Sequence, residues 1–158
     1  MSDRARKRVL CVASGGGHWV QMLRLRPAFA GCDVAFVTVR DAYRTDIAED
    51  LSRGARFYVV NDATRWNKFL LLLQAARVLL ILLRERPDAV ITTGAAPGFF
   101  AVRLGKMLGA RVCWIDSIAN VEHLSLSGEK AGRFVNLWLT QWPHLAREGG
   151  PRFEGAVL

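Results

Sequence analysis

The stretch VASGGGHWVQML, residues 12–23, decides the fold, because an apolar run stops at three consecutive glycines and a helical pattern then begins at once. Glycine loses more backbone freedom on folding than any other residue, so three in a row indicate a tight turn or a close approach of a ligand to the backbone. A strand, a glycine turn and a helix form the first part of a βαβ unit. The N–H groups at the start of such a helix attract phosphate or developing negative charge.

The rest of the chain repeats this alternation of short β-branched runs and longer helical runs. The predicted strands are RVLCVAS (8–14), DVAFVTV (33–39), RFYVV (56–60), DAVITT (88–93), ARVCWIDS (110–117) and NLWLT (136–140). The predicted helices cover about His18–Ala30, Tyr43–Ser52, the run that begins at Trp66, Pro97–Leu108 and a short segment before residue 136. Such alternation predicts an α/β fold, a Rossmann-like parallel sheet with helices on both faces. We expect one domain over residues 1–158, because a chain of this length with 51% hydrophobic residues buries one good core.

Charge and cysteine content narrow the functional classes. The 22 Lys and Arg against 14 Asp and Glu give a formal charge of +8, which attracts phosphates, nucleic acid or an anionic membrane. Apart from Arg4–Arg8 the basic residues are scattered between apolar runs, so no nucleic-acid partner is predicted. Cys11, Cys32 and Cys113 lie in or beside strand patterns without metal-ligand spacing, which is typical of reduced core thiols in the cytoplasm. No signal peptide and no metal site are predicted.

Three unusual loops follow predicted strands, and ligands of doubly wound sheets bind at the carboxyl ends of the strands. These loops are ASGGGH (13–18), TTGAAPG (92–98) and DSIANVEHLSLSG (116–128). We expect them to line one edge of the sheet, which we term the rim. Candidate acid or base groups in them are His18, Asp116, Glu122 and His123.

The position of His18 in the first turn of its helix favours the neutral imidazole, which can act as a base. The alternative reading is that the glycines only pack helix against strand and that His18 is a surface residue. His123 fits a solvated loop residue equally well, and TTGAAPG fits an ordinary turn between a strand and a helix.

Nucleotide-binding motifs of the common kinds are incomplete in the glycine turn. Counting from Gly15, the sixth position is Val20 where a dinucleotide fingerprint has glycine, and the second strand ends in Val39 and Arg40 instead of an acidic residue. No Walker lysine follows the glycines. Arg40 leaves an NADP-dependent reductase as a rival hypothesis, and the broken fingerprint weighs against it.

The run FLLLLQAARVLLILL, residues 69–83, forms a helix of about 22 Å, too short for the hydrocarbon core of about 30 Å. Its polar positions, Asn67, Gln74, Arg77 and Arg84, are expected in one narrow stripe. The remaining apolar surface, represented by Phe69, Leu72, Leu79 and Leu83, is wider than one sheet-facing side needs. We expect this surface to meet a partner subunit or the membrane interface, with Lys68, Arg84 and Arg86 near lipid headgroups. The alternative is a helix buried within a dimer.

Taken together, SGGGH, TTGAAPG, WIDSIANVEHLSLSG and NLWLTQWPHL resemble the acceptor-side, membrane-anchoring subunit of two-part GT-B glycosyltransferases. That family includes a subunit of the eukaryotic dolichyl-diphosphate chitobiose-forming transferase and bacterial PssD-type relatives in exopolysaccharide and capsule synthesis. The likeness runs from about Val9 to the C-terminus. The eukaryotic members carry an N-terminal transmembrane helix, whereas only SDRARKR precedes the first predicted strand.

The resemblance implies the N-terminal half of a GT-B enzyme that needs no metal and no cofactor. Its partners would be a donor-binding glycosyltransferase subunit in a heterodimer, a UDP-sugar, a polyprenyl-diphosphate-linked acceptor and the membrane surface, at the cytoplasmic face of the inner membrane. We expect inverting hexosyl transfer, with His18, Asp116 and Glu122 as candidate catalytic residues. The expected diphosphate- or substrate-binding residues are Ser14, Gly15, Gly16, Gly17, Gly94, Ser125, Ser127 and Gly128. The rival function is a non-catalytic scaffold that recruits a self-sufficient transferase to the membrane.

Overall fold

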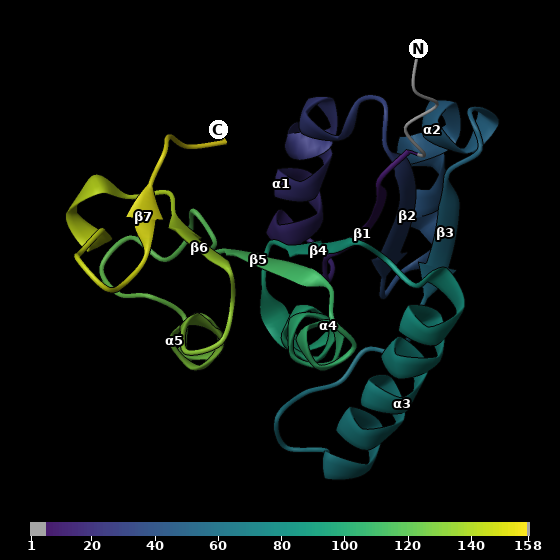
Figure 1. Ribbon diagram of the computed structural model, residues 1–158. Coiled ribbons are helices and arrows are strands. Elements are labelled where there is room, and N and C mark those ends of the chain that lie inside the picture. Colours follow the sequence, from purple (N-terminus) through teal and green to yellow (C-terminus); the bar gives the residue numbers. More distant parts are fainter. Residues whose placement is uncertain (1–5, 158) are drawn as a thin grey trace.

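The computed structural model describes residues 6–157, so Arg4 in the basic start of the chain lies outside the described residues (Figure 1). Its strands are β1 (Arg8–Val12), β2 (Asp33–Thr38), β3 (Arg56–Val59), β4 (Ala89–Thr92), β5 (Arg111–Ile115), β6 (Leu137–Thr140) and β7 (Arg152–Phe153). All neighbouring strands pair in parallel, in the order β3-β2-β1-β4-β5-β6-β7. The predicted α/β class and parallel sheet are confirmed. The two-residue β7 was not predicted, because so short a strand has no periodicity.

The α-helices are α1 (Gly17–Leu25), α2 (Ala48–Ser52), α3 (Lys68–Glu85), α4 (Ala95–Met107) and α5 (Leu126–Gly132), with 3₁₀ segments at Arg26–Phe29, Asp41–Ile47 and Pro143–Leu145. The prediction of one helix over residues 43–52 was wrong, because a 3₁₀ segment, Asp41–Ile47, occupies the first half of that range and α2 only the second half. The first helix also ends earlier than expected. Pro27 falls in the 3₁₀ segment that follows it, since proline has no N–H to continue an α-helix.

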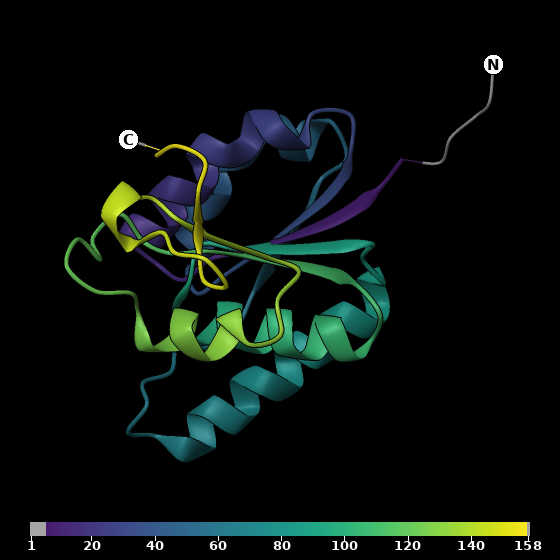
Figure 2. The same cartoon turned by 60° about the vertical axis from the view of Figure 1, so that its left-hand side comes forward.

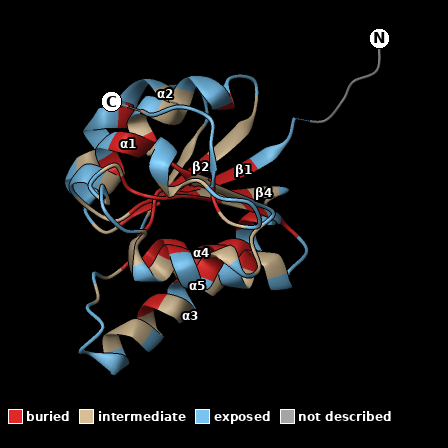
Figure 3. Ribbon diagram, turned by 90° about the vertical axis from the view of Figure 1, so that its left-hand side faces the viewer, coloured by how far each residue is buried: buried red, intermediate tan, exposed pale blue. Residues whose placement is uncertain are grey.

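Helices cover both faces of the sheet, as expected: α1 and α2 lie on one face, and α3, α4 and α5 on the other (Figure 3). Alternate residues of β1 therefore enter two cores. Leu10 and Val12 join the cluster under α3 and α4, whereas Val9 and Cys11 join the cluster that contains Trp19 of α1. Buried on both faces, the central strands read as continuous apolar runs, which is typical of parallel sheets.

Helix α3 is fixed to the edge of the sheet through its C-terminal end. The guanidinium of Arg56 in β3 donates to both carboxylate oxygens of Glu85 at 2.8 and 3.0 Å, and to Asp33 at 2.7 Å. The hydroxyl of Tyr58 also donates to Glu85. The N-terminal half of α3 extends away from the sheet, as Figures 1 and 2 show. One end of α3 is thus clamped while the other projects outward.

Candidate functional site

The three loops predicted to form the rim do lie at one edge of the sheet. They follow β1, β4 and β5, which are adjacent parallel strands, so their carboxyl ends meet at the same edge. Between β1 and β4 the strand order reverses, and such a switch point is where doubly wound sheets bind ligands. Helix α1 joins all three loops, because His18 bonds to Thr93 after β4 and Gln21 bonds to Ser117 after β5.

Tyr43 contacts the glycine turn, residues 15–17, through its hydroxyl. The N–H of Gly16 donates to the Tyr43 hydroxyl at 2.9 Å, and a Cβ on Gly15 would lie 3.2 Å from the same oxygen. Gly16 has φ 65°, a conformation that favours glycine. At Gly17 a Cβ would meet no atom within 4 Å, so no neighbouring protein group explains the absence of a side chain there.

The amides of Gly17 and His18 start helix α1 and therefore have no carbonyl four residues earlier within the helix. They lie at the positive end of the helix dipole. Tyr43 was not singled out in the sequence; its ring stacks on Trp19 with centroids 5.2 Å apart and an interplanar angle of 14°. This stack fixes the hydroxyl that holds Gly16.

His18 is partly buried against the loop that follows β4. Its Nδ1 lies 2.7 Å from the carbonyl oxygen of Thr93, and the Thr93 hydroxyl donates to the carbonyl of His18 at 2.7 Å. Because a carbonyl only accepts, Nδ1 carries the proton in the neutral ring, and the lone pair is on Nε2. The geometry thus leaves Nε2 as the atom able to take a proton.

Gly94 leaves room for the imidazole of His18. A Cβ on Gly94 would lie 3.0 Å from Cε1 and 3.1 Å from Nδ1 of His18, and the residue has φ 122°. It also precedes α4, which begins at Ala95 and not at Pro97 as expected. Gly94, the first glycine of TTGAAPG, is therefore required by the contact with His18 and by its own backbone conformation.

Asp116 is buried and holds the long loop after β5 in place. Its Oδ1 accepts from the N–H of Ser117 at 3.0 Å and from the side chain of Asn120 at 2.8 Å, and its Oδ2 accepts from the N–H of Ser125 at 3.0 Å. With a 2% exposed fraction and both oxygens engaged, the carboxylate organises residues 116–125.

The segment Ser125–Gly128, at the end of the loop after β5, begins helix α5. The Ser125 hydroxyl accepts from the N–H of Gly128 at 2.9 Å, which makes Ser125 the N-cap. A Cβ on Gly128 would lie 2.8 Å from Asp116 Oδ2, from Ser125 Oγ and from Trp114 Nε1. Packing and capping thus explain Ser125 and Gly128, while the half-buried Ser127 makes no side-chain hydrogen bond in the described part of the chain.

Glu122 and His123 are exposed at the outer part of the same loop, and neither side chain is hydrogen-bonded or ion-paired within residues 6–157. The loop is instead held in place by hydrogen bonds to residues 141–144, the QWPH segment. Trp142 donates its indole N–H to the carbonyl of Ile118 at 2.8 Å, and Nε2 of His144 lies 2.6 Å from the carbonyl of Val121. Glu122 is thus held near the rim on a solvent-exposed segment.

Part of the apolar surface of α3 is exposed. Phe69, Leu72 and Leu83 are exposed, at 74%, 70% and 49%, and Leu79 is half-buried. The expectation for Gln74 was wrong: it is fully buried and donates to the carbonyl of Asn61 at 2.7 Å. The solvent-facing apolar residues recur at intervals of three or four, a pattern we call the outer stripe: Phe69, Leu72, Ala76, Leu80 and Leu83.

The outer stripe lies opposite the buried residues Gln74, Val78, Ile81 and Glu85, by the 100° rotation per residue of an α-helix. Just before α3, Arg65 lies over the ring of Trp66, 4.7 Å from its centroid, and Trp66 is 80% exposed. No helix within residues 6–157 is both long and apolar enough to cross a bilayer.

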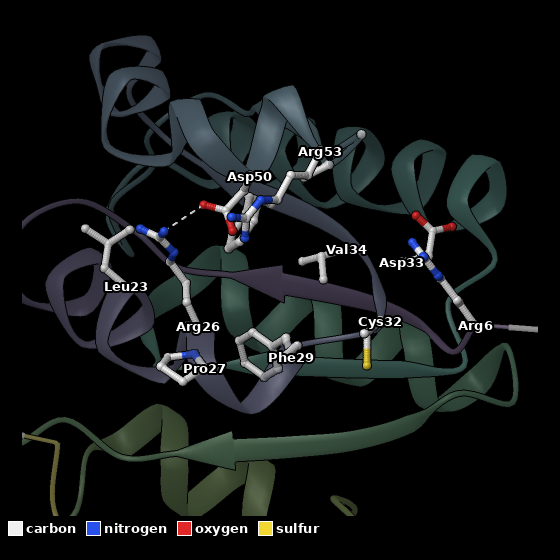
Figure 4. Close-up of a pocket in the computed structure, with 15 residues that line it drawn as sticks. Arg6, Leu23, Arg26, Pro27, Phe29, Cys32, Asp33, Val34, Asp50 and Arg53 are labelled. Atoms are coloured by element: carbon white, nitrogen blue, oxygen red, sulfur yellow. Dashed lines mark ion pairs between the residues drawn. The ribbon is translucent and has the colours of Figure 1, made fainter.

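A groove of about 510 Å³ lies away from the rim, near the amino ends of β1, β2 and β3 at the opposite edge of the sheet. Figure 4 shows Arg26 paired with Asp50 in it, at 3.0 Å, beside Phe29 and Cys32. Within the described residues, no three His, Cys, Asp or Glu side chains gather as a metal-ligand set.

Fold and rim together define the class: the chain has the architecture of the N-terminal half of a GT-B protein. Its fold matches MurG of Acinetobacter baumannii with a TM-score of 0.72 at 16% identity, over 93% of this chain and 45% of MurG. A UDP-N-acetylglucosamine 2-epimerase of Rickettsia bellii matches with a TM-score of 0.69 at 12% identity, over 96% of this chain and 45% of the epimerase. The chain thus spans less than half of these structures.

In sequence, the chain is similar to a glycosyltransferase subunit. It is 28% identical over 183 residues to the UDP-N-acetylglucosamine transferase subunit ALG14 of Eremothecium gossypii, covering 96% of this chain and 80% of that protein. The corresponding subunit of Schizosaccharomyces pombe is 38% identical over 65 residues, 38% of this chain and 31% of that protein. No protein-family model matches the chain.

Proposed function

We propose that this protein is the acceptor-side subunit of a split glycosyltransferase. It would act with a donor-binding partner subunit to move a sugar from a UDP-sugar onto a sugar linked to polyprenyl diphosphate. The observation that carries the proposal is the pairing of His18 with Thr93, which puts the proton on Nδ1 and leaves Nε2 able to accept one in the first turn of α1, where the amides of Gly17 and His18 begin the helix. The similarity to a transferase subunit selects transfer over epimerisation.

In the proposed reaction, Nε2 of His18 takes the proton from the acceptor hydroxyl as the oxygen attacks the anomeric carbon of the donor. The bond from that carbon to the diphosphate oxygen breaks, and UDP leaves with the bonding electron pair. A single displacement of this kind inverts the anomeric configuration. The Nδ1–H bond to Thr93 keeps the ring in one tautomer before the proton transfer and stabilises the imidazolium afterwards.

The diphosphate of the acceptor is assigned to the glycine turn. The amides of Gly17 and His18 and the dipole of α1 supply positive potential there, while the bare surface of Gly17 permits close approach. Gly16 sets the conformation of the turn and does not bind the diphosphate through its N–H, because that N–H donates to the Tyr43 hydroxyl. Ser14 and Ser127 remain candidates for contacts with the acceptor sugar.

We assign Asp116 to positioning the loop of residues 116–125 and not to proton transfer, because both of its oxygens accept N–H donors. Glu122 is the rival base, being an exposed carboxylate on that same loop. Substitution of each carboxylate by its amide separates these roles.

Attachment to the membrane is assigned to the outer stripe of α3 together with Trp66. The stripe is apolar and fully displayed, and Arg77 and Arg84 lie along one flank of it with Lys68 at the start of the helix. Apolar side chains bounded by basic ones suit the headgroup region of an anionic bilayer. We propose a peripheral position on the cytoplasmic face of the inner membrane, where the rim could reach a lipid-linked acceptor.

The test is transfer of radiolabel from a panel of UDP-sugars into membrane lipid, with this chain and its partner present separately and together. UDP-N-acetylglucosamine is the first donor, since the similar subunits are named for it. UDP-glucuronic acid, UDP-galactose and UDP-glucose test the exopolysaccharide or capsule context that the sequence resemblance implies. Label that enters lipid only when both chains are present supports the proposal.

Two results of the same experiment would contradict the proposed function. Transfer by the partner alone onto a soluble acceptor analogue identifies this chain as a recruiting scaffold. A stable complex that transfers no sugar from any donor in the panel overturns the catalytic proposal.

A further inference from the structure

Two buried glutamines, Gln21 and Gln141, connect the elements of the rim through side-chain hydrogen bonds. Gln141 follows β6 and is 4% exposed, while Gln21 is on α1 and is 3% exposed. Nε2 of Gln141 donates to Oε1 of Gln21 at 2.7 Å and to the carbonyl of Asp116 at 3.0 Å. Nε2 of Gln21 in turn donates to the hydroxyl of Ser117 at 3.3 Å.

Two backbone groups determine which end of the Gln141 side-chain amide is the oxygen and which is the nitrogen. The N–H of Val157 donates to one end of the Gln141 amide at 2.9 Å, and only an oxygen can accept it. The carbonyl of Asp116 contacts the other end, which must therefore be the NH₂ group. With Gln141 oriented in this way, Gln21 has to present its oxygen to Gln141 and its nitrogen to Ser117. The network is thus directional, with each amide oxygen accepting and each amide nitrogen donating.

We infer that Gln141 is a positioning residue for the rim: it sets where α1, and with it His18, stands relative to the loop that begins at Asp116. Helix α1 bears His18 one turn before Gln21, and Asp116 and Ser117 begin the loop that bears Glu122. Fully satisfied buried polar networks hold one geometry, because any displacement leaves a polar group unpaired away from water. As a statement about transfer, this inference rests on the proposed function.

The first test replaces Gln141 by Leu, which keeps the bulk and removes every hydrogen bond. In the complex with the partner subunit we expect kcat to fall about 10²-fold while KM for the UDP-sugar changes less than about twofold, since a misplacement of about 1 Å has an effect of this size. The matched control is Val112→Ala, which removes bulk from the core under α4 and touches none of the network. It should lower Tm and leave kcat unchanged.

A second readout does not depend on activity. The ¹⁵N resonances of His18, in ¹⁵N-histidine-labelled chain within the same complex, report the Nδ1–H tautomer and its bond to Thr93. They are identified by their loss in His18→Asn. We expect them to shift in Gln141→Leu and to stay in place in Val112→Ala. If Gln141→Leu does not fold, Gln141→Asn, which is too short to reach both Gln21 and Asp116, takes its place.

The two proposals fail in different ways. If the unmodified complex transfers no sugar, the proposed function fails, while the His18 resonances still decide whether Gln141 positions α1. If the unmodified complex is active and the Gln141 variants keep both kcat and the His18 resonances, the inference about Gln141 is wrong. A loss of Tm equal to that of Val112→Ala with no other change has the same meaning.

Discussion

His18 and Thr93, 75 residues apart, are joined by two hydrogen bonds of 2.7 Å that run in opposite directions between helix α1 and the end of β4. One bond selects the tautomer of the imidazole, and the other fixes the backbone that bears it. The ring therefore has little freedom to turn, and Nε2 is the ring nitrogen left able to accept a proton.

Replacement of His18 tests the proposed base. His18→Ala removes both the base and the bond to Thr93, whereas the amide nitrogen of His18→Asn can still donate to the Thr93 carbonyl. We expect both variants to lower kcat by about 10²- to 10⁴-fold, because general-base catalysis contributes a factor of this size. Steady-state label transfer by the complex measures it. A fully active His18→Asn variant would restrict His18 to a structural role.

Substitution of Gly17 tests whether this glycine is needed for ligand binding and not for folding. No atom lies within 4 Å of a Cβ at this position, so Gly17→Ala should leave Tm unchanged or raise it slightly. If the diphosphate approaches the turn closely, the added methyl lowers kcat/KM at least about tenfold, or about 1.4 kcal/mol. Melting curves and transfer kinetics on the same preparation give the answer.

Gly94→Ala is the comparison for that experiment, since φ 122° and the contact with His18 predict a loss of stability of about 1–3 kcal/mol. Unchanged transfer by Gly17→Ala would remove the glycine turn from the acceptor site.

The two carboxylates of the loop should respond differently to amide substitution. Asp116→Asn turns an NH₂ group toward N–H donors in a buried place, so we expect the free energy of unfolding to fall by about 1.5–3 kcal/mol. Glu122→Gln should not change stability, because the side chain is exposed. Urea unfolding checks both. A fall in kcat for Glu122→Gln of 10²-fold or more at unchanged stability would transfer the role of base from His18 to Glu122.

The outer stripe of α3 predicts binding to lipid. Loss of one inserted leucine removes about 1.5–3 kcal/mol of burial, so Leu72→Glu should weaken binding to anionic liposomes about tenfold or more. Flotation of the complex with vesicles of phosphatidylglycerol and phosphatidylethanolamine measures it. Met107→Glu, an equally exposed apolar site at the end of α4, is the control and should float like the unmodified chain. No flotation by the unmodified complex would assign the outer stripe to a protein partner.

Thiol reactivity tests the burial of the strands. Burial raises the pKa of the Cys113 thiol to about 12 and also raises the pKa of Cys11. At pH 8 the Cys113 thiolate is therefore about 10⁻⁴ of the total, and we expect iodoacetamide to modify Cys32 first. The folded state holds the Cys113 proton more tightly than the unfolded chain does. Its contribution to stability is thus full below about pH 9 and is lost as the pH rises toward 12.

Mass spectrometry after alkylation at pH 8 and pH 9 follows each cysteine, and chain unfolded in urea, where all three react, is the control. Equal modification of Cys113 and Cys32 in the folded protein would contradict the raised pKa of the Cys113 thiol, since the two side chains are half-buried alike.

The sheet was predictable because each strand is short, β-branched and separated from the next by a helical run, and parallel pairing then follows from the connections. The meeting of three loops at the rim followed from the same rule. The shape of the glycine turn was not predictable in full, since Tyr43 reaches it from a 3₁₀ segment that has no periodic pattern.

The partners of the buried glutamines also escaped sequence reasoning. Gln21 and Gln141 are 120 residues apart, and a lone glutamine in a helix or after a strand has no local signature of burial. Gln74 shows the same difficulty on α3, where it was expected in one polar stripe with Arg77 and Arg84 but is fully buried. Its side-chain amide donates to the carbonyl of Asn61, a contact that depends on how the loop before α3 folds.

The clamped, outward-projecting form of α3 has a consequence for how the protein would meet its acceptor. The chain leaves β3 at the same edge as the rim, so α3 starts on the rim side of the molecule and returns along the sheet (Figure 2). A protein held at the bilayer by the first turns of this helix keeps its rim close to the plane in which lipid-linked substrates diffuse. Encounter then becomes a search in two dimensions at a high effective concentration, and its rate depends on lateral mobility and surface density more than on affinity in solution.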